Sequence, residues 1–216
     1  MRKAQNRETV LQALRERISS RELAPGSRLS EQQLVAEFGV SRAVIRDVFI
    51  KLEQRGLIKR SFKKSVTVVR LGLDEIFEIY AVRELLEGLC ARLAAQNVPK
   101  ESWQDLVEIF QAHMEEVVKR GDLDEYIKGL QSLRSRMIAA ANSPILTEML
   151  DLINDKVSGI ARQLVILPGR LQQGLVEQRA ILQALRRGDP DESERLRREN
   201  IRSSAEYLRR YERFLL

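Results

Sequence analysis

Two arginines, Arg42 and Arg46, lie four residues apart in the segment FGVSRAVIRDVF (38–49). In an α-helix this spacing places both guanidinium groups on one face, where like charges destabilise the helix by about 0.2–0.5 kcal/mol. A planar guanidinium can donate to guanine O6 and N7 or grip a phosphate group. Ser41 can cap the helix, whose first N–H groups attract anions. The pattern indicates a helix that binds an anion such as DNA, and a solvated basic face is the simpler alternative.

The distribution of charge along the chain supports a nucleic-acid partner. Residues 1–70 contain 16 Lys and Arg against 7 Asp and Glu, a net charge of +9, whereas the remainder of the chain has a net charge of −3. A basic segment joined to a mildly acidic one is typical of a nucleic-acid-binding part attached to a different domain. A basic surface without a partner is the alternative.

Composition narrows the class of protein. The chain has 216 residues, 44% hydrophobic and 31% charged, and no apolar run reaches the ~18 residues that a membrane span needs. The basic N-terminus lacks the apolar core of a secretory signal, so a cytoplasmic, nucleoid-associated protein is expected. Cys90 and His113 are the single cysteine and histidine, which excludes an internal disulfide and argues against a Cys/His zinc site. We expect Cys90 to be buried, His113 to lie at the surface or in packing, and the protein not to be an enzyme.

The N-terminal third has the pattern of a helix-turn-helix. Apolar residues at helical spacing predict helices over 5–22, over 30–38, and from Ser41 to Gly56. The segment LAPGSRL (23–29) contains the Pro-Gly pair that separates the first two helices. Three helices with these short connections are the arrangement in which the third helix enters the DNA major groove.

After the third helix the apolar period changes from that of a helix to that of a strand. A hairpin is therefore predicted that pairs 57–60 with 66–70. Lys63 and Lys64 lie at its basic tip. Helices followed by such a hairpin form a winged helix-turn-helix, and Arg28 and Gln32 are weaker candidates for phosphate contacts.

The rest of the chain predicts helices alone. Ser143 and Asp189, each followed by proline, are predicted to cap the starts of two helices. The last helix is expected to turn many of its arginines outward. The predicted helices span 74–96, 100–120, 123–141, 144–166, 169–187 and 190–215. The predicted fold is mainly α, with a winged helix-turn-helix in 1–70, a linker in 71–75, and an all-α bundle of about six helices for ligand binding and dimerisation in 76–216.

The chain resembles the GntR family of transcription regulators. The stretch PGSRLSEQQLVAEFGVSRAVIRDVFIKLEQRGLI (25–58) is similar to the winged-helix signature of that family. The helical part resembles the FCD effector domain of the FadR-like subfamily in three stretches, VRELLEGLCARLAA (82–95), AANSPILTEML (140–150) and EQRAILQALRRGDPDESERLRRENI (177–201).

This resemblance implies a homodimer that binds a short inverted repeat in double-stranded DNA and whose affinity is changed by a small molecule. Arg42 and Arg46 match the DNA-contacting arginines of the family. Two positions depart from the family pattern, since Val44 stands where proline is frequent and Ser65 where the wing usually has glycine. The full set of DNA-binding candidates is Ser41, Arg42, Arg46, Arg28, Gln32, Lys63 and Lys64.

The resemblance also raises the question of a metal, because many FCD domains hold a divalent cation with one Asp and three His. The matching positions carry Leu130, Arg134, Gln178 and Asn200 instead. Neither a guanidinium nor an alkyl group binds such a cation. We therefore predict no metal at this site and no other cofactor.

An arginine in place of the metal suggests an acidic ligand. Arg83 matches a family arginine that lines the effector cavity, and a guanidinium suits a carboxylate. The predicted ligand-binding residues for a small organic acid are Arg83, Arg134, Gln178 and Asn200. Alternatively these residues satisfy one another, or Glu84 and Glu87, inside the bundle. The protein would then be a ligand-independent, architectural DNA-binding protein with a degenerate pocket.

Overall fold

The computed structural model describes residues 6–61 and 65–215, which group into two compact units. One unit runs to Gly72 and includes Asn154–Gly159, and the other comprises Leu73–Ile153 and the residues from Ile160 onward. None of the helices in the described residues is both long and apolar enough to cross a lipid bilayer.

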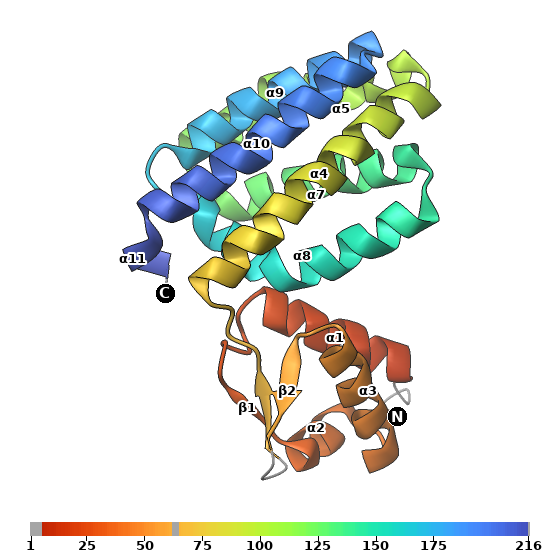
Figure 1. The fold of residues 1–216 in the computed structure, drawn as a ribbon, viewed down its shortest axis with the longest axis vertical. Helices are drawn as coiled ribbons and strands as arrows, with labels where there is room; N and C mark the ends of the chain where they lie inside the picture. The colour runs from red at the N-terminus through yellow and green to blue at the C-terminus, as the bar shows by residue number, and fades with distance from the viewer. Residues whose placement is uncertain (1–5, 62–64, 216) are drawn as a thin grey trace. The chain divides into compact units, whose positions relative to one another are not determined.

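Three short helices form most of the first unit, drawn in red to orange in Figure 1. They are α1 (Arg7–Ser19), α2 (Glu31–Phe38) and α3 (Arg42–Gln54). Each buries one apolar stripe in a shared core around Leu14, Ile45 and Leu52. The predicted helix-turn-helix is confirmed, although the first helix is shorter than 5–22.

A small antiparallel sheet completes this unit. Its strands are β1 (Arg28–Leu29), β2 (Ile58–Arg60) and β3 (Val66–Val68), in the order β1-β3-β2. The predicted hairpin is present, with Lys59 opposite Thr67. The sequence pattern missed β1 and treated it as part of a break, because two residues show no periodicity and their pairing partner is almost forty residues away.

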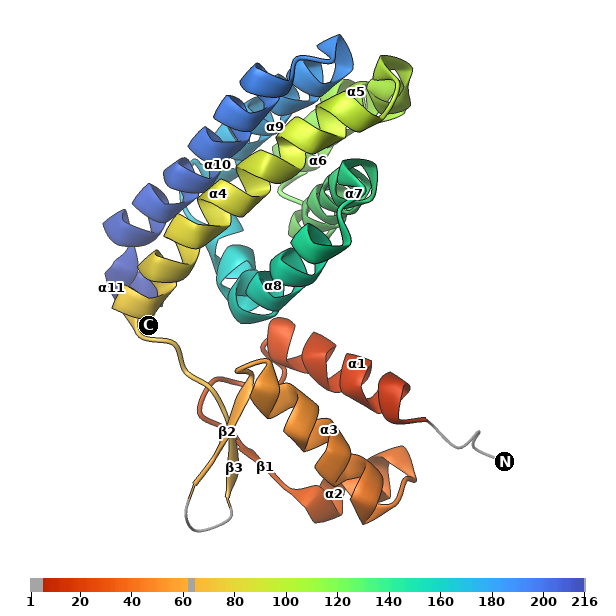
Figure 2. The same ribbon diagram turned by 45° about the vertical axis from the view of Figure 1, so that its right-hand side comes forward.

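The second unit consists of helices. They are α4 (Leu73–Asn97), η1 (Lys100–Trp103), α5 (Gln104–Glu108), η2 (Ile109–His113), α6 (Met114–Arg120), α7 (Leu123–Ala141), α8 (Pro144–Val165), α9 (Arg170–Arg187), α10 (Pro190–Arg210) and α11 (Glu212–Leu215). The longest contact runs between α4 and α10, which lie side by side in Figures 1 and 2. Helices α7 and α9 also pack on this pair, so inward-facing side chains of all four helices meet.

Two predicted helices differ from the structure. The expected helix 100–120 is interrupted by η2, a π-helical turn. Arg179 from α9 donates to the carbonyl oxygens of Phe110 (2.8 Å) and Gln111 (2.6 Å) in that turn. The expected helix 190–215 ends at Arg210, and a short separate helix follows. The spacing of apolar residues reveals neither the contact from Arg179 nor the end of α10 at Arg210. Periodicity alone therefore predicts continuous helices in both places.

Most predicted helix starts are confirmed by side-chain caps. The side chain of Ser30 accepts from the backbone N–H of Gln33 at 3.3 Å, and that of Asp189 accepts from Glu192 at 3.1 Å. The predicted helix start at Ser143 is confirmed, with Pro144 as the first residue of α8, but the Ser143 side chain makes no capping hydrogen bond. Its carbonyl oxygen instead accepts from the Thr147 hydroxyl at 2.9 Å.

Candidate functional site

The exposed start of α3 presents the first candidate surface. Gly39 ends α2 in the left-handed region at φ 66°, which lets the chain turn into α3 within three residues. The Ser41 hydroxyl caps α3 by accepting from the backbone N–H of Val44 at 3.3 Å. Because Ile45 is the residue that turns into the core, Arg42 and Arg46 both face solvent.

The two arginines differ in their surroundings. Arg46 donates from Nε to Glu31 Oε2 at 3.1 Å, and its side chain remains 63% exposed. Arg42 has no ion-pair partner among the residues that the structure describes. Arg42 can therefore approach an anion directly, whereas Arg46 is oriented by a carboxylate at the start of α2.

Two of the remaining candidates of this surface lie on described elements. Arg28 on β1 and Gln32 on α2 are exposed, as a phosphate contact requires. Lys63 and Lys64 lie outside the described residues. Beside them, Ser61 N–H donates to the Ser65 carbonyl at 3.0 Å, so the non-glycine residue at 65 is compatible with hairpin pairing.

A buried carboxylate, Glu87 on α4, forms the second candidate site. Its side chain is 1% exposed and receives hydrogen bonds from three guanidinium groups on three helices. Arg197 on α10 donates to Oε2 from Nη2 (2.7 Å) and Nε (3.1 Å). Arg83 on α4 and Arg134 on α7 each donate from Nε to Oε1 at 3.3 Å.

The charges around Glu87 determine its ionisation. Burial alone would raise the pKa of this carboxyl group, but Arg197, Arg83 and Arg134 outweigh burial and hold the pKa well below its usual range. Glu87 is therefore ionised at neutral pH. The four side chains together carry three positive charges and one negative charge.

A second polar centre surrounds Glu177 on α9. Arg170 donates from Nη1 to Glu177 Oε2 at 2.8 Å, and Asn200 donates from Nδ2 to the same oxygen at 2.6 Å. Asn200 also accepts from Arg197 Nη1 at 3.0 Å, which joins the two centres. Gln178 donates from Nε2 to Asn200 Oδ1 at 3.4 Å, and its own side-chain carbonyl oxygen is buried with no hydrogen-bond partner among the described residues.

The four predicted ligand residues thus meet in one network, as their helices converge. Their partners inside the chain are those of the alternative prediction, since Arg83 and Arg134 bond to Glu87 and Gln178 bonds to Asn200. Arg197 and Arg170 were missed. Many arginines of the last helix do face outward as expected, among them Arg195 and Arg202, and Arg197 is a buried exception. Apolar residues at neighbouring positions do not reveal which arginine faces α4.

The residues at the family's metal positions do not fit a divalent cation. Arg134, Gln178 and Asn200 lie near the cationic centre around Glu87, and a guanidinium group repels a metal ion. Within residues 6–61 and 65–215, no three His, Cys, Asp or Glu side chains come together in a way suited to a metal.

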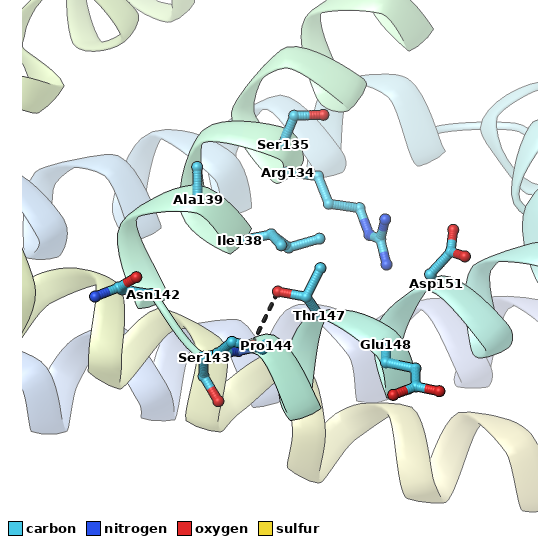
Figure 3. A pocket seen from close by; sticks show the side chains of 10 residues that line it. All are labelled: Arg134, Ser135, Ile138, Ala139, Asn142, Ser143, Pro144, Thr147, Glu148 and Asp151. Carbon is cyan, nitrogen blue, oxygen red and sulfur yellow. Dashed lines mark hydrogen bonds between the residues drawn. The ribbon is translucent and has the colours of Figure 1, made fainter.

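A groove between α7 and α8 leads to Arg134 (Figure 3). Its volume is about 700 Å³. Apolar groups of Ile138 and Pro144 and the hydroxyl group of Thr147 lie on its walls. Arg134 contributes the guanidinium group of the groove and also donates from Nη2 to the Leu150 carbonyl at 3.1 Å. It therefore connects the open groove to buried Glu87.

The residues expected to play no part in the site are in their predicted places. Cys90 is 1% exposed, and burial raises the pKa of its thiol to about 12. His113 lies at the surface with Nε2 2.7 Å from Glu125 Oε1. A protonated buried thiol is a poor nucleophile.

Comparisons with known proteins match two segments of the chain. Residues 6–68 match the model of "Bacterial regulatory proteins, gntR family", and residues 78–203 match the FCD domain. The chain is 24% identical over 180 residues to the HTH-type transcriptional regulator McbR of Escherichia coli K12, covering 82% of this chain and 81% of McbR. It is 24% identical over 191 residues to the HTH-type transcriptional repressor RspR of the same strain, covering 87% and 82%.

Among solved structures, E. coli McbR/YncC has a similar fold. The TM-score is 0.79 at 22% sequence identity, over 95% of this chain and 98% of that one. Both matched relatives are named as regulators of transcription.

Proposed function

We propose a specific function from one premise: this chain belongs to the gntR family of bacterial regulatory proteins and carries an FCD domain, so it is a transcriptional regulator. In our proposal it binds an inverted-repeat operator as a homodimer. A small organic acid bound in the helical domain changes its affinity for DNA.

The observation that carries the DNA-binding proposal is the start of α3. Here a serine-capped helix N-terminus and two exposed guanidinium groups lie within one turn of each other. Base edges in the major groove and phosphate groups are the ligands that such a helix start recognises. Arg42 and Arg46 are therefore the principal contacts, and Ser41, Arg28, Gln32 and the lysines Lys63 and Lys64 are supporting ones.

Exposed apolar stripes support the homodimer. On α4, Val82, Leu85 and Leu89 share an outer face and are 41–56% exposed. On α8, a second stripe of Ile145, Met149 and Leu152 is 36–64% exposed. Contiguous exposed apolar side chains mark association surfaces, and a twofold dimer pairs the same surface of each subunit. We propose that these stripes meet their copies in the partner subunit.

The acidic-effector proposal depends on the cluster around Glu87. Three guanidinium groups face one carboxylate, and Arg134 reaches the open groove. A ligand carboxylate would reduce the excess positive charge. Arg83 and Glu87 occupy the inner face of α4, whose outer face carries the proposed dimer stripe, so α4 is the element through which ligand and dimer geometry affect each other.

A second function is favoured by the same hydrogen bonds. Arg83, Arg134 and Arg197 already have an internal carboxylate, so these side chains do not depend on a ligand for a hydrogen-bond partner. The protein would then bind DNA independently of any effector.

Selection of bound duplexes from a random pool tests the proposal. Wild-type protein should enrich an inverted repeat whose half-sites are about 10 base pairs, or a multiple of that, apart. The Arg42→Ala variant should enrich none, and Arg195→Ala, a matched loss of an exposed arginine on α10, should behave as wild type. Recovery of unrelated sequences by the wild type would contradict the proposal. Repeating the selection with carboxylic acids separates the effector-controlled function from the effector-independent one.

A further inference from the structure

The carboxylate of Glu87 is surrounded by arginine side chains in the way that a protein surrounds a bound carboxylate ligand. Its carboxylate is enclosed by guanidinium groups from α4, α7 and α10 and has almost no contact with solvent. Glu84, one turn earlier on α4, also has two arginine partners, Arg198 and Arg202, but lies nearer the surface at 16% exposure. The difference indicates that the Glu87 surroundings are built for a carboxylate rather than for an ordinary surface ion pair.

The two oxygens of Glu87 are held unequally. Oε2 has two bonds from Arg197, of 2.7 and 3.1 Å, whereas Oε1 has two bonds of 3.3 Å from Arg83 and Arg134. Charge-assisted hydrogen bonds are normally 2.7–2.9 Å, so those to Oε1 are weak. The donors to Oε1 are also the more exposed arginines, at 13% and 20% against 6% for Arg197. The Oε1 side is therefore the side at which another anion can compete.

The groove of Figure 3 provides the route to that side. Arg134 lies on its wall, so an acid in the groove reaches the guanidinium without separating the core helices. Glu148 and Asp151 also line the groove, and their charges oppose a general attraction of anions. Binding then depends on a direct contact with Arg134, and the groove, at about 700 Å³, is large enough to admit a small acid.

We propose that the cluster around Glu87 is a carboxylate-binding site whose resident carboxylate belongs to the chain itself, and that an acidic effector binds by taking Arg134 from Glu87 Oε1. Glu87 keeps Arg197 through Oε2, so no charge is left unpaired. Ligand binding exchanges an α4–α7 contact for a ligand–α7 contact. This inference rests on the proposed acidic effector and specifies its competitor.

Chemical rescue tests the site. In Glu87→Ala the atoms removed beyond Cβ are those of acetate, so added acetate can refill the vacated position. We expect 50 mM sodium acetate to raise the melting temperature of full-length Glu87→Ala by several degrees more than 50 mM sodium chloride does. Glu84→Ala is the matched control, from the same helix with two arginine partners, and acetate should give it no such advantage. Equal effects of acetate and chloride on Glu87→Ala would overturn the proposal.

Competition tests the exchange, and also serves if Glu87→Ala does not fold. Glu87→Gln keeps the side-chain volume and removes the competing charge. Binding of ¹³C-acetate, measured by NMR, should be about tenfold tighter to Glu87→Gln than to wild type, within the range typical of coupling between sites. Unchanged affinity would refute the competition while leaving an acidic effector in place. Absence of carboxylate binding to all variants, with operator binding intact, would instead refute the effector part of the proposed function as well.

Discussion

Replacement of Arg197 by alanine should destabilise the helical domain strongly. The change removes two hydrogen bonds to Glu87 Oε2 and one to Asn200, and both members of the ion pair are at most 6% exposed. Removing one partner of a buried pair typically lowers the free energy of unfolding by 3–5 kcal/mol. Because Glu87 keeps Arg83 and Arg134, we expect the lower end, about 3 kcal/mol.

Arg195→Ala, two residues away on α10, is the control. Arg195 has hydrogen bonds of 2.6–2.7 Å to Glu192 and Glu199, shorter on average than those of Arg197, but its side chain is 53% exposed. Solvent screens an exposed pair, so its loss should change the free energy of unfolding very little. Hydrogen-bond length alone would predict the larger contribution to stability from Arg195, whereas burial predicts the larger contribution from Arg197.

The assay is urea unfolding followed by tryptophan fluorescence. Trp103 is the only tryptophan of the chain and is fully buried in the helical unit, so the signal reports that unit. A loss below about 1 kcal/mol for Arg197→Ala, or equal losses for both variants, would refute the reasoning that burial sets the strength of these pairs.

Three further predictions concern charge. Burial alone would raise the pKa of Glu87, yet the surrounding arginines lower it. The stability that ionised Glu87 contributes is therefore complete above about pH 4.3 and is lost as the pH falls. Between pH 6 and pH 3, urea unfolding should show a larger loss of unfolding free energy for wild type than for Glu87→Gln. Glu31→Gln frees Arg46 from an exposed ion pair worth about 0.2–1 kcal/mol. Fluorescence anisotropy at low salt should therefore show about 1.4- to 5-fold tighter binding to non-specific duplex DNA. An unchanged affinity would count against a contact between Arg46 and DNA. Cys90, whose pKa burial raises to about 12, should react with iodoacetamide at pH 8 far more slowly in the native protein than in urea, and equal rates would contradict its burial.

Local chemistry made much of the first unit predictable. Ser30 and Ser41 cap their helices as expected, because a cap needs only a side-chain oxygen and a backbone N–H three residues later. The hairpin followed from alternation of apolar residues. The strand β1 could not be predicted in this way, because two residues show no periodicity and their partners in β3 are distant in sequence.

The helical unit was predictable in its elements and less so in its interior. The four predicted ligand residues do meet, as the resemblance to the FCD domain implied: Arg83, Arg134, Gln178 and Asn200. Their binding of an effector remains a prediction. The residues that the sequence did not reveal were Arg170 and Arg197, and the burial of Arg197 depends on how α10 is rotated against α4.

The sequence by itself determined which segments are helical, where most of them begin, and that two exposed arginines stand at the start of a capped helix. These properties depend on residues within a few positions of each other. Only the tertiary structure decided that Glu87 is buried among three arginines and that Arg195, on the same helix as Arg197, stays exposed. The physical reason is that the strength of a charge pair depends on the removal of water, and water is removed by helices that are distant in sequence.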